Sequence, residues 1–485
     1  MSSLKKQSTI AFAWDFIGKM TRQSVGFIIS IFLARLLTPE DFGLLALVNV
    51  IISISISMMD MGLGVALIQR KEVTDKHYGS VFFFNVTIGI LLAIILFISA
   101  PFVGNFYDNK ELIIITKAMS PIFILQSFGN VIRMRLRKQL QYDIPTQGNI
   151  IAASISGIIG VTLAFSGYGV WSLVVQALLN PIFNNCYLFI RAKWRPKLIF
   201  SWKALKELWS FGLKMFFSSM LDTTFRQLDT LIIGKLFSEK ILGFFFRARS
   251  LNQYVVEYSS SSIMSVMLPA LSIIQDNEIR FKDTVSKTYH LVSFLAFFLS
   301  GLLFVTGDNL ILFLFGEKWS PSIPIFRLLI LTAYVYPLSA VLVNVLSAKG
   351  NSKDFFYLEI IKKVFFGVAF IFAFTEGLET YLKAYIIASA LAVATNIFYA
   401  SCEINVTQWW FYKRTLPYLV ISIVIGGAIF SLKEYLGFNN FIDLLILGSS
   451  YSIFFIGISY LLKVKGLSFI LNELNKLNIK KHLKR

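Results

Sequence analysis

The 485-residue chain has few of the residues that carry catalysis or bind metals in soluble proteins. It contains two cysteines and three histidines, and charged residues make up 15% of it. Two cysteines exclude a disulfide-rich scaffold, and His77, His290 and His482 lie too far apart to form a metal-ligand motif. Phosphate-binding glycine loops, Cys-x-x-Cys and His-Glu-x-x-His are also absent. We therefore predict a protein that is not an enzyme and has no metal or cofactor.

What the chain has in abundance is apolar residues. Hydrophobic residues make up 56%, and the mean hydropathy is +0.68, which is too high for a soluble globular protein. The first apolar stretch is too long and too charged for a cleavable signal peptide, so we expect it to remain as a membrane helix. Runs of about 20 apolar residues predict an all-α polytopic membrane protein with about fourteen spans. These are residues 10–37, 42–69, 79–104, 112–132, 145–165, 168–190, 210–235, 241–270, 284–306, 321–348, 355–374, 379–400, 415–432 and 442–462.

Cationic residues gather in alternate connections between the spans. Lysine and arginine number 46 against 27 acidic residues, giving a net charge of +19. The opposite connections are short, the longest being residues 307–320, and their cationic residues are Lys110, Lys240, Lys318 and Lys433. By the positive-inside rule, both termini are cytoplasmic. The positive charge therefore faces membrane lipid and is not a nucleic-acid footprint.

The chain contains a weak internal repeat with an offset of 200 residues. Met20 matches Met220, Gly43 matches Gly243, and residues 34–36 match residues 234–236. Two hydrophobic segments can also match by chance. A duplicated bundle is the better interpretation, and it predicts two pseudo-symmetric six-helix lobes.

The repeat predicts the domain organisation. Residues 1–200 form an N-terminal lobe, with an amphipathic joint starting at residue 191, and residues 201–402 form a C-terminal lobe. Residues 403–465 are two peripheral spans, and residues 466–485 form a basic amphipathic cytoplasmic tail. The apolar face of the joint, including Trp202, Leu205 and Trp209, predicts a helix on the cytoplasmic membrane surface.

Three of the predicted spans carry charges at helical spacing. Because a charge in hydrocarbon costs a few kcal/mol, these faces must look into protein or a wet cavity. One interpretation is internal pairing, for instance of Asp222 or Asp229 with Arg226. The alternative is a cationic cleft, because guanidinium groups suit phosphate oxygens. The candidate substrate-binding residues are Lys19, Arg22, Gln23, Arg226, Arg247, Arg249 and Gln253. The candidate ion-coupling or charge-pairing residues are Asp15, Asp60, Asp222, Asp229 and Glu257.

Two segments resemble a known family. Residues 32–43 (FLARLLTPEDFG) and 60–70 (DMGLGVALIQR), followed by Ser80-Val81-Phe82 and Asn85, are similar to bacterial polysaccharide exporters. The likeness is to the Wzx-type, teichuronic-acid or colanic-acid exporter branch of the multidrug/oligosaccharidyl-lipid/polysaccharide superfamily. It implies a two-lobed, MATE-like transporter in the bacterial cytoplasmic (inner) membrane. The implied function is a flippase that moves undecaprenyl-diphosphate-linked oligosaccharide to the outer leaflet by alternating access.

The resemblance also implies roles and partners. The cationic candidates would clamp the diphosphate, and the acidic ones would bind a coupling proton or sodium ion, or pair with the arginines. A polysaccharide polymerase or other assembly protein would be a partner. Three alternatives remain: a multidrug or organic-cation antiporter, a membrane polysaccharide polymerase or glycosyltransferase, and a structural scaffold. An antiporter would favour an acidic cleft, and an enzyme would need a substantial outward loop, so both are disfavoured.

Overall fold

The computed structural model describes residues 2–197, 199–433 and 439–471, except for some side chains within these ranges. All regular elements in these ranges are helices. The chain folds into two compact units, Met1–Gly243 (unit 1) and Phe244–Arg485 (unit 2).

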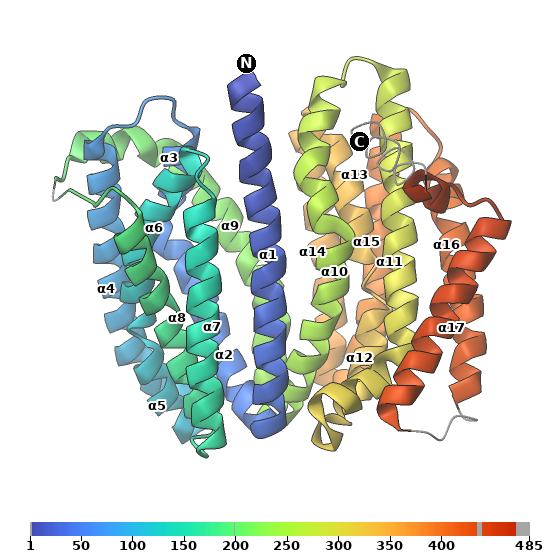
Figure 1. The fold of residues 1–485 in the computed structure, drawn as a ribbon, viewed down its shortest axis with the longest axis horizontal. Coiled ribbons are helices and arrows are strands. Elements are labelled where there is room, and N and C mark those ends of the chain that lie inside the picture. Colours follow the sequence, from blue (N-terminus) through green and yellow to red (C-terminus); the bar gives the residue numbers. More distant parts are fainter. Residues whose placement is uncertain (1, 198, 434–438, 472–485) are drawn as a thin grey trace, which may run out of the picture. The chain divides into compact units, whose positions relative to one another are not determined.

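Unit 1 contains nine helices within the described residues. α4, α6, α7 and α8 lie side by side, α1 packs on α7, and α9 packs on α2, α3 and α4 (Figure 1). Their bounds are α1 (Ser2–Leu36), α2 (Pro39–Asp60), α3 (Leu63–Gln69), α4 (Asp75–Phe106), α5 (Lys110–Met119), α6 (Ile122–Lys138), α7 (Asp143–Phe165), α8 (Val170–Arg191) and α9 (Trp202–Leu236).

Unit 2 is built around the long helix α11. Apolar side chains of α11, α13, α15, α16 and α17 form its core, with Phe294, Phe297, Tyr451 and Phe455 among them. The first turn of α10 belongs to unit 1 and the rest to unit 2. The bounds are α10 (Glu239–Ile273), α11 (Glu278–Phe315), the 3-10 turn η1 (Glu317–Trp319), α12 (Ser322–Ile330), α13 (Val335–Lys349), α14 (Ser352–Thr375), α15 (Leu378–Glu403), α16 (Gln408–Leu432) and α17 (Asn440–Leu461).

Ten helical segments of the described residues are long and apolar enough to cross a membrane, which makes this a multi-pass membrane protein. The four other predicted spans correspond to α1, α9, α10 and α14, whose lengths of 35, 35, 35 and 24 residues would also suffice. The count of fourteen stays a prediction.

Three of the predicted spans contain an interruption between two helices; residues 110–138 and 322–349 still count as single candidate spans, whereas span 42–69 is corrected to Pro39–Asp60. Span 42–69 breaks between α2 and α3, span 112–132 between α5 and α6, and span 321–348 between α12 and α13. The first break is explained by backbone conformation, since Met61 and Gly62 have φ values of 43° and 70°. A Cβ on Gly62 would also overlap the carbonyl oxygen of Gly212 in α9. Only glycine combines this φ with this approach.

The predicted amphipathic joint is not a separate surface helix. Residues 202–209 form the first turns of α9, which continues without a break to Leu236. Leu205 and Leu208 of this segment are buried against α3 and α4, where they contribute to a small core with Leu63 and Val81. The lobe boundary at residue 200 stays a prediction, and of the predicted basic tail, residues 472–485 lie outside the described part.

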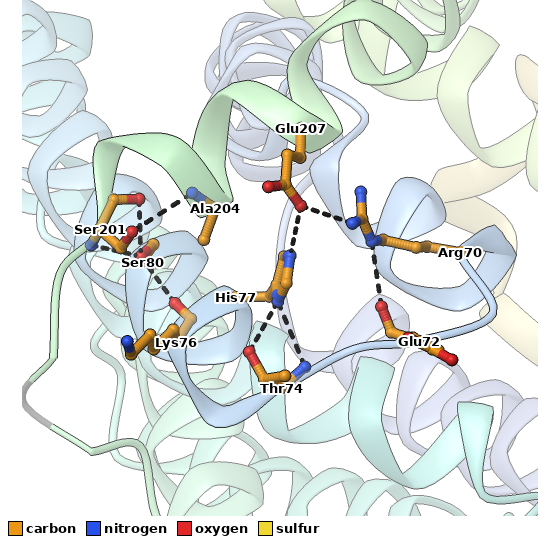
Figure 2. Close-up of polar contacts among 9 residues, drawn as sticks. All are labelled: Arg70, Glu72, Thr74, Lys76, His77, Ser80, Ser201, Ala204 and Glu207. Carbon is orange, nitrogen blue, oxygen red and sulfur yellow. Dashed lines mark hydrogen bonds and ion pairs between the residues drawn. The ribbon is translucent and has the colours of Figure 1, made fainter.

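Polar contacts also hold the start of α9 to the end of α3 and the start of α4 (Figure 2). The carboxylate of Glu207 accepts from Arg70, and its Oε2 lies 3.2 Å from Nε2 of His77. The backbone N–H of Ser201 donates to Oγ of Ser80 at 2.8 Å, and that hydroxyl lies 3.2 Å from the carbonyl oxygen of Ser201. The hydrogen bond with His77, and then the charge of Arg70, lower the pKa of Glu207 below its ordinary value.

We predict that Glu207→Gln lowers the thermal stability of the detergent-solubilised protein at neutral pH. Because the folded-state pKa of Glu207 is depressed, its stabilising effect is present above about pH 4.5 and is lost as pH falls through the folded-state pKa. The gap in melting temperature between wild type and variant should therefore narrow below pH 4.5. Glu72→Gln, at an exposed site nearby, is the control. A gap that stays constant at all pH values would contradict the ionic role of Glu207.

A second close backbone approach joins the starts of α2 and α10. The carbonyl oxygen of Glu239 contacts Gly43, and the carbonyl oxygen of Pro39 contacts Gly243, so that a Cβ on either glycine would overlap an oxygen. The two contacts are related by the 200-residue offset of the repeat. Lys240 and Glu40, which share that offset, form an ion pair at 3.3 Å.

We predict that Gly43→Ala reduces the yield of folded protein and lowers its melting temperature. The added methyl group must displace a backbone carbonyl, and overpacking of this kind destabilises proteins by about 1–3 kcal/mol. Fluorescence-detected size-exclusion chromatography with a temperature ramp measures both effects. The control is Gly26→Ala in α1, where a Cβ meets open space. Equal stability of the two variants would show that the contact is dispensable.

Unit 2 holds an ion cluster around a buried carboxylate, with members from α11, α12 and the residue that follows α16. The predicted outward connection 307–320 is partly wrong, because α11 continues to Phe315 and so includes Asp308. Asp308 accepts from Nε of Arg327 at 3.0 Å and also pairs with Lys433. The side chain of Asp308 is 7% exposed, and two cations compensate its burial.

Candidate functional site

The candidate residues on α9 form a polar face in unit 1. Asp222 and Arg226 make an ion pair at 2.9 Å, one helical turn apart, and their side chains are 63% and 60% exposed. The structure thus contains one of the two pairings suggested for Arg226, and the role of the pair stays a prediction. Asp229 is half-buried and accepts from the backbone N–H of Thr230 at 2.7 Å. The exposed Arg226 therefore retains surface that an anion can reach.

Polar groups also connect this face of α9 to α2. The side-chain amide of Gln227 donates to Oγ of Ser53 at 3.2 Å, and the hydroxyls of Ser57 and Thr223 lie 3.4 Å apart. These neutral contacts pair polar groups of the two helices with each other.

On α1, Lys19 and Arg22 are exposed and Gln23 is half-buried. The side-chain oxygen of Gln23 is buried and has no hydrogen-bond donor within the described part of the chain. The side chain of Asp15 lies outside the described part, as does that of Glu257 on α10. The helix spacing places Asp15, Lys19 and Arg22 on one face, and their joint role stays a prediction.

Arg247 is placed differently from the other candidates. It lies in unit 2 and is 3% exposed. The carbon of its guanidinium lies 4.6 Å from the ring centre of Phe315 and 4.9 Å from that of Trp319. Arg249 is half-buried and Gln253 is exposed. Cation–π contact substitutes for part of the lost hydration, so this arginine joins α10 to the end of α11 and is closed to a phosphate in this conformation.

Asp60 is held by three hydrogen-bond donors from three elements of unit 1. Its Oδ1 accepts from the side-chain amides of Asn130 at 2.8 Å and Asn85 at 3.3 Å, and its Oδ2 accepts from the backbone N–H of Gly64 at 2.9 Å. The break after Asp60 makes this possible, because it presents the start of α3 to the carboxylate at the end of α2. A carboxylate accepting three such bonds fixes the geometry of the break.

We predict that Asp60→Asn lowers the melting temperature of the purified protein. An amide places an NH2 group where the carboxylate accepted, and a buried donor left without an acceptor costs about 1–3 kcal/mol. Asp276→Asn, in an exposed connection, is the control and should leave stability unchanged. If Asp60→Asn keeps wild-type stability but abolishes transport, Asp60 acts in ion coupling and its bonding role is secondary.

Unit 1 also contains a polar pocket that was not predicted from the sequence. Its volume is about 440 Å³, and its walls come from α2, α6, α7 and α8. The polar wall consists of one guanidinium and five side-chain amides, from Arg133, Gln126, Asn149, Gln176, Asn180 and Asn184. A signal was present in the sequence, because the last three are spaced four residues apart along α8 and share a face. In an apolar span, neutral amides are a weaker signal of a binding site than charged residues are.

Comparison with known proteins identifies the chain's relatives. A family profile described as "Polysaccharide biosynthesis protein" matches residues 32–324. The chain belongs to this family. It is 23% identical to the lipopolysaccharide biosynthesis protein WzxC of Escherichia coli K12, over 87% of this chain and 88% of that protein. It is 24% identical to the teichuronic acid biosynthesis protein TuaB of Bacillus subtilis, over 89% and 90%. The resemblance to this exporter branch is therefore confirmed.

Solved structures show the same fold. The lipid II flippase MurJ in an inward closed conformation has a TM-score of 0.71 at 18% identity, covering 93% of this chain and 99% of that one. An inward-facing multidrug MATE transporter of the MOP superfamily has a TM-score of 0.63 at 15% identity, covering 80% and 98%. The predicted all-α, MATE-like fold is confirmed. The chain is thus a helical membrane protein with a transporter fold.

Proposed function

We propose that this protein is a flippase that translocates undecaprenyl-diphosphate-linked oligosaccharide from the cytoplasmic to the outer leaflet, for assembly of a cell-surface polysaccharide. The observation that carries the proposal is the family match, because relatives aligned over most of this chain are named for the biosynthesis of surface polysaccharides. The fold is one that a lipid II flippase also uses.

The polar residues of unit 1 suit such a substrate. Lys19, Arg22 and Arg226 present exposed cationic side chains on two helices, and a diphosphate requires cations that water and substrate can reach. Asp222 holds Arg226 in place through their ion pair. Arg247 would join a clamp only after leaving its aromatic rings, so we assign it to positioning α10.

Transport would proceed by alternating access, driven by a proton or sodium ion bound at one of the acidic candidates. The protein would lie in a bacterial inner membrane with both termini cytoplasmic, as the distribution of lysine and arginine favours. A polysaccharide polymerase or another assembly protein would receive the flipped product.

We predict that cells lacking this protein accumulate diphosphate-linked oligosaccharide on the cytoplasmic leaflet. Wild type should restore the distribution, and Arg226→Ala should slow translocation at least about tenfold, because a charge-assisted contact to the diphosphate is lost. Accessibility of the glycan to a membrane-impermeant enzyme in inverted vesicles measures the leaflet.

The control is Arg280→Ala, an exposed arginine in the first turn of α11 outside the predicted spans. It should restore translocation as wild type does, at equal amounts of inserted protein. An unchanged lipid distribution together with altered efflux of organic cations would overturn the flippase and favour the antiporter.

A further inference from the structure

The pocket of unit 1 combines a cation with groups that both donate and accept hydrogen bonds. Among the described residues that line the pocket, none is acidic, and Arg133 is the cation. One guanidinium N–H of Arg133 donates to the backbone oxygen of Gln126 at 3.4 Å. The positive charge of the pocket is therefore not neutralised by its own walls, which favours an anionic occupant.

The site is built to accommodate this arginine. Gly129 lies one helical turn before Arg133 on α6, and a Cβ there would come within 2.8 Å of a guanidinium nitrogen and overlap the side-chain oxygen of Asn185. The missing side chain thus leaves room for two polar groups within a span. In a close-packed apolar core, a side chain at this position would normally fill the space.

The amides set the second requirement on the occupant. Asn184 is 5% exposed and donates to the side-chain oxygen of Asn149, while its own side-chain oxygen has no donor among the described residues. Asn180 donates to Oγ of Ser156 at 3.3 Å. An amide oxygen needs a donor, which a hydroxyl group provides and a fully ionised diphosphate ester does not. A wall that mixes amide oxygens and amide N–H groups therefore suits a ligand that carries several hydroxyls.

We propose that this pocket binds an acidic sugar residue of the transported glycan, with its carboxylate at Arg133 and its hydroxyls on the amides. The inference rests on the proposed function and deepens it, because it assigns the glycan a site separate from the exposed cations Lys19, Arg22 and Arg226. A pocket of about 440 Å³ lies within the range of small-molecule sites, and one cation matches one carboxylate better than it matches a diphosphate.

The test measures binding of three probes to the purified full-length protein in nanodiscs. Methyl glucuronide is the acidic probe, methyl glucoside is its neutral match, and inorganic pyrophosphate tests for a phosphate site. Saturation-transfer NMR and calorimetry give the affinities. We expect wild type to bind the glucuronide at least about tenfold more tightly than the glucoside. Arg133→Gln should remove that preference, and Arg133→Lys should keep part of it.

Matched variants separate this site from its surroundings. Arg137→Gln, an exposed arginine one turn further along α6, should retain the preference, and so should Arg226→Ala. Asn180→Asp adds a negative charge to the pocket wall. It should therefore lower the affinity for methyl glucuronide and leave the affinity for methyl glucoside unchanged. If Arg133→Gln fails to fold, the affinities of Asn180→Asp for methyl glucuronide and methyl glucoside test the proposal instead.

Two results would overturn the inference. The first is equal binding of glucuronide and glucoside by wild type. The second is pyrophosphate binding that Arg133→Gln abolishes, which would make the pocket a phosphate site. The flippase proposal fails separately. An unchanged leaflet distribution in cells lacking the protein would contradict it, even if the purified protein still prefers glucuronide.

Discussion

A charged side chain inside a membrane span is stable only where the protein replaces the water that it has lost. Three residues show three ways of doing this. Asp60 accepts from two amides and a backbone N–H, Asp308 pairs with two cations, and Arg247 lies against two aromatic rings. Each arrangement joins elements that are distant in sequence, so the desolvation of a few charges fixes much of the helix packing.

Backbone geometry follows from the same requirement. The break between α2 and α3 turns the start of α3 toward Asp60, and Gly62 makes this turn possible against the backbone of α9. The reciprocal contacts of Gly43 and Gly243 bring the starts of α2 and α10 together. Small residues at these points allow backbone groups to approach where a side chain would hold them apart.

The cationic residues differ in whether other groups of the protein hold them. Arg247 and Arg327 are held by rings or acids, whereas Lys19 and Arg22 are exposed. Arg133 belongs to neither group, because it lines a pocket whose other polar groups are neutral amides. A lipid-linked glycan contains both kinds of chemistry, a charged diphosphate and a hydroxyl-rich saccharide. We propose that separate parts of the molecule recognise them.

Several features were predictable from sequence because they depend on local composition. Hydropathy indicated the helical membrane class, residues 32–43 and 60–70 indicated the family, and i, i+4 spacing indicated the pairing of Asp222 with Arg226. Each signal lies within one helix or one short segment. Span length and helical periodicity act over such distances, so a single sequence reports them directly.

Other features depend on which helices come together. The sequence did not show that Asp308 meets Arg327 and Lys433, that Arg247 is covered by Phe315 and Trp319, or that Arg133 faces the amides of α7 and α8. The helix breaks were also missed, because hydropathy averages over the few residues that interrupt a helix. By itself the sequence determined the membrane class, the family and the candidate charges. Tertiary packing alone decided which charges are compensated and which stay accessible, because desolvation depends on neighbours that are far away along the chain.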